Sequence, residues 1–163
     1  MDDHGALAPI VAFLREIGIE VRFAPISTKT VNPGLTIDRG ALVVDEALLR
    51  NPGDLLHEAG HLAILTPAVR ASSSDWVGKG GGEELAAMAW SYAAAVHLEI
   101  EPSVVFHANG YKGGSASLVE NYTEGRYIGV PLLEWLEMCD RPGGALPYPR
   151  IRAWLNPTDR NPR

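Results

Sequence analysis

Apolar positions in the first part of the chain follow helical and strand periods in turn. From Leu7 to Ile17 they recur every three or four residues, which predicts a helix that ends at Gly18. Residues 19–24 alternate between apolar and polar side chains, as in a half-buried strand. Residues 35–38 and 41–45 read as two more strands around a tight Asp-Arg-Gly turn. A helix, a strand and a hairpin before a further helix predict an α+β domain.

The next apolar run, residues 55–65, predicts a largely buried helix. Asn51 is a favourable N-cap residue, and Pro52 suits the first helical position. We therefore expect the helix to begin at these two residues. Its apolar surface is interrupted by the sequence His57-Glu58-Ala59-Gly60-His61.

This His-Glu-x-x-His sequence has the spacing of a metal site. Residues four apart lie on one face of a helix, so His57 and His61 can reach the same Zn²⁺ ion. Glu58 lies beside them, where it can take a proton from water at the metal. The alternative is two core histidines with ordinary hydrogen bonds. It is less favourable, because two imidazoles and a carboxylate are costly to bury without a charged partner.

A catalytic zinc needs a third protein ligand, and a second helix supplies two candidates. Residues 83–97 are alanine-rich and strongly helical, and we expect them to pack against the first helix. Glu83 and Glu84 both begin faces that can be buried, so spacing alone does not choose between them. Either can instead be a solvated acid that the helix dipole favours. Residues 71–82, rich in serine and glycine, are expected to form a flexible loop before this helix.

The two helices together resemble a known family of enzymes. A His-Glu-x-x-His sequence, followed some two dozen residues later by a glutamate that opens an Ala-rich helix, is similar to gluzincin zinc metallopeptidases, and most of all to the small ImmA/IrrE-type domain. That family carries a pattern close to Glu-x-x-Ala-Asn-x-Phe-Ala on its second helix. When the pattern starts at Glu84, this chain matches it at Ala87 and at the aromatic Trp90, and departs from it at Met88 and Ser91. The resemblance covers roughly residues 5–100 and favours Glu84 over Glu83 as the third ligand.

The resemblance implies a small zincin-like metallopeptidase fold. A short twisted sheet would pack on the metal helix and on the second, glutamate-bearing helix, and the substrate would be a peptide or protein. The strand at 41–44 directly precedes the metal helix. It is either a sheet edge that can receive an extended peptide or a plain interior strand, and the pattern alone does not choose between them. No helix-turn-helix is attached, so a DNA-linked role does not carry over.

The second half of the chain holds candidate donors for a tetrahedral intermediate. Proteases of this class need a group that steadies the developing oxyanion. His107 and Tyr111 adjoin a glycine-rich segment and are our candidates, although each can equally be an ordinary core or surface residue. Residues 130–139 predict a packing helix. Residues 1–155 are expected to form one domain, and residues 156–163 a flexible tail.

Composition limits the remaining alternatives. The chain has 163 residues, a formal net charge of −6 and no basic run, so nucleic acid and anionic membranes are not expected as partners. A single cysteine, Cys139, leaves no disulfide framework and no cysteine-type zinc site. No leader or membrane-spanning run is visible, which predicts a cytoplasmic protein. Nothing in the composition indicates the oligomeric state.

The sequence thus predicts a zinc-dependent metalloprotease. His57, His61 and Glu84, or Glu83, would hold the metal, and Glu58 would be the general base. The alternative is a metal-binding or protein-interaction module with the same fold that is catalytically silent or acts only after a partner activates it. A fourth side chain on the metal would favour that alternative, because structural zinc sites are closed.

Overall fold

The segments with periodic apolar positions form helices and a small sheet, which together make an α+β structure. The computed structural model describes residues 3–75 and 80–162. Within these ranges the elements in chain order are η1 (Asp3–Ala6), α1 (Leu7–Glu16), β1 (Val21–Phe23), β2 (Leu35–Asp38), β3 (Ala41–Val44), α2 (Asp54–Ala63), α3 (Pro67–Ser72), α4 (Gly81–His97), α5 (Pro102–Val105), η2 (Tyr111–Gly113), α6 (Ser115–Thr123) and α7 (Val130–Trp135), where η marks a 3₁₀ helix.

The three strands form one sheet in the order β1-β3-β2. The predicted hairpin is confirmed: β2 and β3 pair antiparallel, with Asp38 opposite Ala41. Arg39 and Gly40 both have positive φ, 46° and 78°, as a two-residue hairpin turn requires. β1 pairs parallel with the other side of β3. Of the two alternatives for residues 41–44 the structure shows the interior strand, because both sides of β3 are hydrogen-bonded and β1 and β2 hold the edges.

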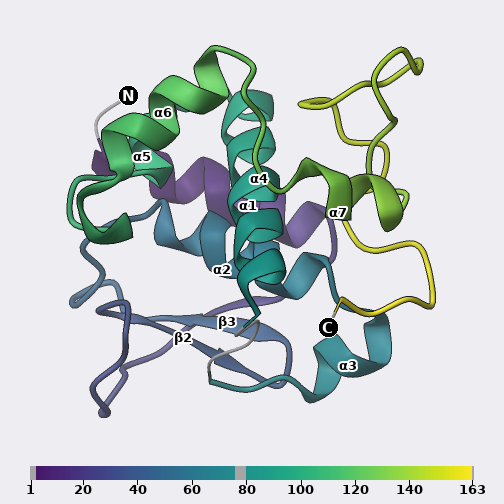
Figure 1. Cartoon of the computed structure of the whole chain (residues 1–163). Helices are drawn as coiled ribbons and strands as arrows, with labels where there is room; N and C mark the ends of the chain where they lie inside the picture. Colours follow the sequence, from purple (N-terminus) through teal and green to yellow (C-terminus); the bar gives the residue numbers. More distant parts are fainter. Residues whose placement is uncertain (1–2, 76–79, 163) are drawn as a thin grey trace.

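Helices α2 and α4 pack directly on each other and form the centre of the core. Figure 1 shows α4 crossing α2, with the sheet below α2 in this view. Gly60 makes the close approach possible, because a Cβ atom there would lie 2.8 Å from the carbonyl oxygen of Ala87. The small side chains of α4, such as Ala86 and Ala93, are fully buried, which agrees with the predicted packing of this helix.

The start of α2 differs from the prediction. Asn51 is not the N-cap, since the helix begins at Asp54 and its N-cap residue is Gly53, without a side-chain cap. Residues 51–53 form a turn instead, in which the carbonyl of Asn51 accepts from the Asp54 amide. The Asn51 side chain does not accept from the helix start, because its amide donates to the Asp54 carboxylate. Gly53 lets α5 approach this turn, since a Cβ atom there would meet the Val104 carbonyl oxygen at 2.0 Å.

The second half is more helical than the sequence suggests. Helix α6 was not predicted, and it buries Tyr122 completely, with the hydroxyl donating to the Ile128 carbonyl. Helix α7 is shorter than the predicted 130–139 and ends at Trp135. Part of the predicted loop at 71–82 is helical, because α3 extends to Ser72 and α4 begins at Gly81; residues 76–79 of that loop lie outside the described residues.

The C-terminal segment contacts the end of α2. Asn156 is 4% exposed, and its side-chain amide donates to the carbonyls of Ile64 and Arg160. Asn161 accepts from the Thr66 amide. These contacts place residues 156–161 on the body of the domain, although the sequence predicts a flexible tail there. Across residues 3–75 and 80–162, no helix combines the length and the apolar character needed to cross a bilayer.

Candidate metal centre

Three side chains from two helices meet at one point, where they form a candidate metal site. The Nε2 atoms of His57 and His61 are 3.2 Å apart, because the residues lie one turn apart on α2. Glu84 reaches them from the first turns of α4, with one carboxylate oxygen 3.2 Å from His57 Nε2 and the other 3.1 Å from His61 Nε2. The potential ligand atoms of these residues all lie within 4.8 Å of one another.

The spacing of these donors fits a tetrahedral ion. Zinc binds imidazole nitrogen and carboxylate oxygen at about 2.0–2.2 Å, which places neighbouring ligand atoms of a tetrahedral site about 3.3 Å apart. The observed separations of 3.1 to 3.2 Å are close to this value. At these distances the two imidazole nitrogens and the carboxylate oxygens all face one another. Such an arrangement needs a cation between them, either a proton or a metal ion. The donor set therefore fits a divalent metal, and its chemistry does not by itself identify which one.

The structure brings Glu84, and not Glu83, to the histidines. Glu83 accepts a hydrogen bond at 3.3 Å from the backbone amide of Gly80, so it caps the start of α4. Neighbouring residues on a helix point about 100° apart, and the side of α4 that faces α2 carries Glu84. His97 is at the far end of α4, where its ring contacts Phe13 and Trp154.

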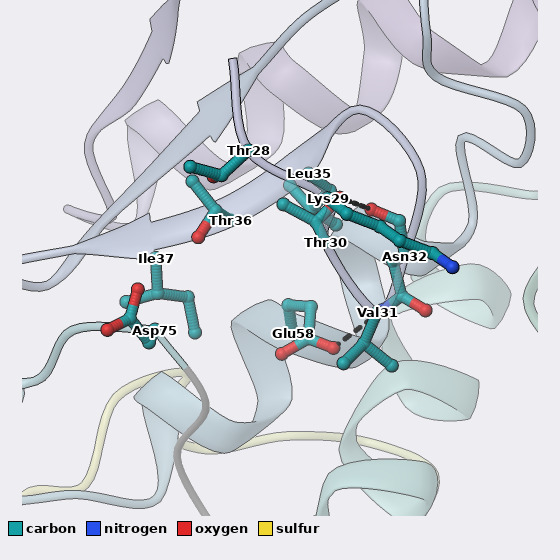
Figure 2. Close-up of a pocket in the computed structure, with 10 residues that line it drawn as sticks. All are labelled: Thr28, Lys29, Thr30, Val31, Asn32, Leu35, Thr36, Ile37, Glu58 and Asp75. Carbon is teal, nitrogen blue, oxygen red and sulfur yellow. Dashed lines mark hydrogen bonds between the residues drawn. The ribbon is translucent and has the colours of Figure 1, made fainter. Parts of the chain in front are cut away.

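Glu58 lies beside the ligands and is held by a residue from a distant loop. Its side chain is largely buried, and Asn32 donates to its Oε1 atom at 2.7 Å (Figure 2). Burial raises the pKa of Glu58, although the neighbouring His57 and His61 oppose that shift. A carboxylate with a raised pKa is a better proton acceptor than an ordinary surface carboxylate. Asn32 is a site residue that the sequence analysis missed.

Tyr111 contacts the candidate ligand His57 from the other side of the site. Its hydroxyl oxygen lies 3.2 Å from His57 Nδ1, and the two rings meet edge to face. Burial raises the pKa of Tyr111 well above its ordinary value, so the phenol stays protonated. When Nε2 of His57 is free to bind a metal, Nδ1 carries the proton and donates to the Tyr111 oxygen.

His107 is paired with Asp54, one turn before His57 on α2. His107 Nε2 lies 2.8 Å from a carboxylate oxygen of Asp54, and both side chains are 12% exposed. The other ring nitrogen, Nδ1, is buried and has no hydrogen-bond partner among the described residues. Neither nitrogen of His107 is thus free to reach a substrate. The pair instead joins the segment that carries Tyr111 to α2.

The ionic groups of the site stabilise one another. Hydrogen bonds to His57 and His61 lower the pKa of Glu84 well below its ordinary range, so Glu84 stays a carboxylate. Burial alone would lower the pKa of His57, but its hydrogen bond to Glu84 and the nearby acids Glu58 and Asp54 raise it overall. The site therefore attracts positive charge, as a cation-binding site must.

Two cavities meet at Glu58. The metal cavity, about 790 Å³ in volume, lies between α2, the start of α4 and residues 107–112. The strand cavity, about 260 Å³, lies between the edge strand β2 and residues 28–32. Val31, Asn32 and Glu58 line both, so the two form one groove past the candidate site. Figure 2 shows Glu58 at the base of this groove, opposite Thr36 and Ile37 of β2.

Sequence reasoning missed Asp54 as well as Asn32, for different reasons. Asp54 lies three residues before His57 and seven before His61, so helical periodicity alone places it on the ligand face. Asn32 is 26 residues from Glu58 in the chain, and no periodicity connects them.

Comparisons with known proteins do not assign this chain to a family. No protein-family model, no curated protein and no solved structure matches the chain. What is established for the site is therefore the structural arrangement itself: His57, His61 and Glu84 form a candidate metal centre on two packed helices of an α+β domain.

Proposed function

We propose that this chain is a zinc-dependent peptidase. His57, His61 and Glu84 would hold the metal, which would supply Lewis-acid polarisation of the scissile carbonyl. The observation that carries the proposal is the placement of Glu58, a buried carboxylate of raised pKa, beside three converging donors at the base of an open groove. A relation to gluzincins of the ImmA/IrrE type, with a zincin-like fold, is part of the proposal.

In this mechanism Glu58 is the general base. It takes a proton from the attacking water and passes it to the leaving amine, and Asn32 holds its carboxylate in place by the hydrogen bond to Oε1. Of the two candidate oxyanion donors, Tyr111 is the better placed. When His57 Nδ1 donates to the Tyr111 oxygen, the phenolic hydrogen remains free to point into the metal cavity. His107 takes a positioning role through Asp54.

Two features favour an open catalytic site over a closed structural one. Within residues 3–75 and 80–162, three side chains that can bind a metal converge, and the side chains of His97 and His107 are engaged elsewhere. His57 and Glu84 line the metal cavity, so a metal held by them would be accessible to substrate. In addition, β2 holds a sheet edge beside Glu58. The Ile37 carbonyl on this edge accepts from the Asp75 amide, and the rest of the edge can pair with an extended peptide.

The test compares wild type with Glu58→Gln and Glu84→Ala. After zinc loading, we expect wild type to hydrolyse a mixture of unstructured peptides, as followed by mass spectrometry. Glu58→Gln should keep the metal and lose turnover, because the amide cannot accept a proton. Glu84→Ala should lose both, whereas the matched control Glu83→Ala should lose neither. Metal content is measured by inductively coupled plasma mass spectrometry.

The outcomes separate the two functions that the sequence predicts. Peptide hydrolysis by Glu58→Gln at the wild-type rate would refute the mechanism. Zinc bound by wild type without hydrolysis of any peptide would favour the silent or partner-activated metal-binding module. Equal metal content in wild type and Glu84→Ala would remove Glu84 from the ligand set.

A further inference from the structure

The basic side chains that the structure describes divide into those with an ion-pair or backbone-carbonyl partner and those with neither. Arg22, Arg126, Arg152 and Arg160, for example, each form an ion pair with a carboxylate. Arg15 and Arg70 donate to backbone carbonyls. Within the part of the chain that the structure describes, the basic side chains that have neither kind of partner are Lys29, Arg50, Lys112, Arg141 and Arg150.

Three of these free cations lie on the groove. Lys29 lines the strand cavity, and Arg50 and Lys112 line the metal cavity. They come from three separate segments: Lys29 from the connection between β1 and β2, Arg50 from the connection between β3 and α2, and Lys112 from η2. In a chain of net charge −6, the fold brings unpaired positive charge to this one groove.

The acidic groups that line the groove, Asp54, Glu58, Glu84 and Asp75, form no ion pair with these cations, and the first three already have partners. Asp54 binds His107, Glu84 binds the two ligand histidines, and Glu58 accepts from Asn32. Asp75 lies at the opposite end of the strand cavity. Figure 2 shows the Lys29 side chain extended past Asn32, away from Asp75. The three cations are thus left to face whatever enters the groove.

Lys112 is held at the rim by an unusual backbone. Tyr111 and Lys112 are consecutive residues with positive φ, 54° and 51°, a region that non-glycine side chains rarely adopt. The segment around these two residues is anchored on both sides. Before them, His107 is hydrogen-bonded to Asp54; after them, Ser115 Oγ donates to the His107 carbonyl. The same backbone turn that points Tyr111 at His57 places the Lys112 side chain on the metal cavity.

We propose that the groove selects peptides that carry carboxylates close to the scissile bond, bound by Arg50 and Lys112 in the metal cavity and by Lys29 in the strand cavity. This inference rests on the proposed function and specifies the substrate class of that site. The carboxylates can come from Asp and Glu side chains or from a free C-terminus, and both place the same anion against the same cations.

The test measures peptide binding to the full chain as zinc-loaded Glu58→Gln, so that turnover does not interfere. The probes are fluorescein-labelled peptides of one length: one rich in glutamate, one with glutamine in its place, and each with a free or an amidated C-terminus. Fluorescence anisotropy should show roughly tenfold tighter binding of a carboxylate-bearing probe than of the neutral, amidated one at low salt, and a smaller difference at 0.5 M NaCl.

Charge reversal identifies the residues. Arg50→Glu and Lys112→Glu should each weaken binding of the acidic probe by about fivefold, the scale of one exposed ion pair. The matched control is Arg141→Glu, which reverses a free, exposed cation outside both cavities. Because all three side chains are exposed, the variants should fold, and their melting temperatures check this.

The results separate this inference from the proposed function. Equal binding of the acidic and neutral probes, or equal weakening by Arg141→Glu and Arg50→Glu, would overturn the inference. If amidation of the probe removes the preference, the groove recognises the C-terminal carboxylate. If replacing glutamate by glutamine removes it, the groove recognises side-chain carboxylates. Either result supports a carboxylate site. Hydrolysis of neutral and acidic peptides at equal rates by wild type would refute the inference alone. Binding of acidic probes without hydrolysis by wild type would refute the proposed function alone.

Discussion

Gly60 sets the distance between the two helices that carry the candidate metal ligands, so Gly60→Ala tests the geometry of the site. The residue lies on α2 between the two histidines and faces Ala87, one turn after Glu84 on α4. An added Cβ atom would lie 2.8 Å from the Ala87 carbonyl oxygen and 3.0 Å from its Cα atom. Since such atoms pack at roughly 3.5 Å, the helices must separate by about 0.5 Å or more.

The expected cost follows from this separation. Overpacking of this kind destabilises a core by about 1–3 kcal/mol, and the better helix propensity of alanine returns about 1 kcal/mol. We therefore expect the free energy of unfolding of the metal-free protein to fall by about 0–2 kcal/mol. The effect on the metal should be larger. A shift of about 0.5 Å exceeds the tolerance of about 0.2 Å for metal–ligand distances, so zinc affinity should fall by about tenfold or more.

The assay is zinc titration against a chelating dye, together with chemical denaturation of the metal-free protein. Gly82→Ala is the matched control, because it also adds a methyl group to a helical glycine, and a Cβ atom there would meet nothing within 4 Å. That variant should bind zinc as wild type does and be slightly more stable. If Gly60→Ala bound zinc as tightly as wild type and Gly82→Ala, the close packing of α2 and α4 would not be what positions the ligands.

Two further predictions concern stability. Zinc at a free concentration of 100 times its Kd should raise the free energy of unfolding by about 2.7 kcal/mol, and excess chelator should reverse the shift; the same melting curve with and without zinc would contradict the metal site. Asn156→Ala should cost about 1–3 kcal/mol, because it removes both amide hydrogen bonds and leaves the buried Ile64 carbonyl without its partner. Asn109→Ala, which removes an exposed amide, is the control, and denaturant midpoints that agree for the two variants would show that the C-terminal segment does not stabilise α2.

Local patterns predicted the elements that carry the candidate site. The helical period placed α2 and α4 correctly, apart from their ends, and the Asp-Arg-Gly turn predicted the β2–β3 hairpin. The pairing of His57 with His61 also followed from spacing, because residues four apart share a helix face whatever surrounds them. These features depend on a few neighbouring residues, so the sequence contains all the information that they need.

Features that depend on distant contacts were predicted poorly. β3 is the central strand because β1 pairs with it from the side opposite the hairpin, and nothing in residues 41–44 signals that partner. Asn51 has the side chain of an N-cap, but in the folded chain its amide donates to Asp54, and the helix begins at Asp54. Helix α6 was overlooked because its apolar positions become a clear stripe only when Tyr122 is known to be buried.

The sequence by itself determined that two imidazoles and a carboxylate share one helical segment. It left open whether Glu83 or Glu84 completes the set, because both begin faces of the second helix that can be buried. Only the tertiary structure decided this. The packing of α4 on α2 at Gly60 turns Glu84 toward the histidines and leaves Glu83 to cap the helix. The same folding brings Asn32 to Glu58 and the cations Lys29, Arg50 and Lys112 to one groove, since these contacts join segments that no local period relates.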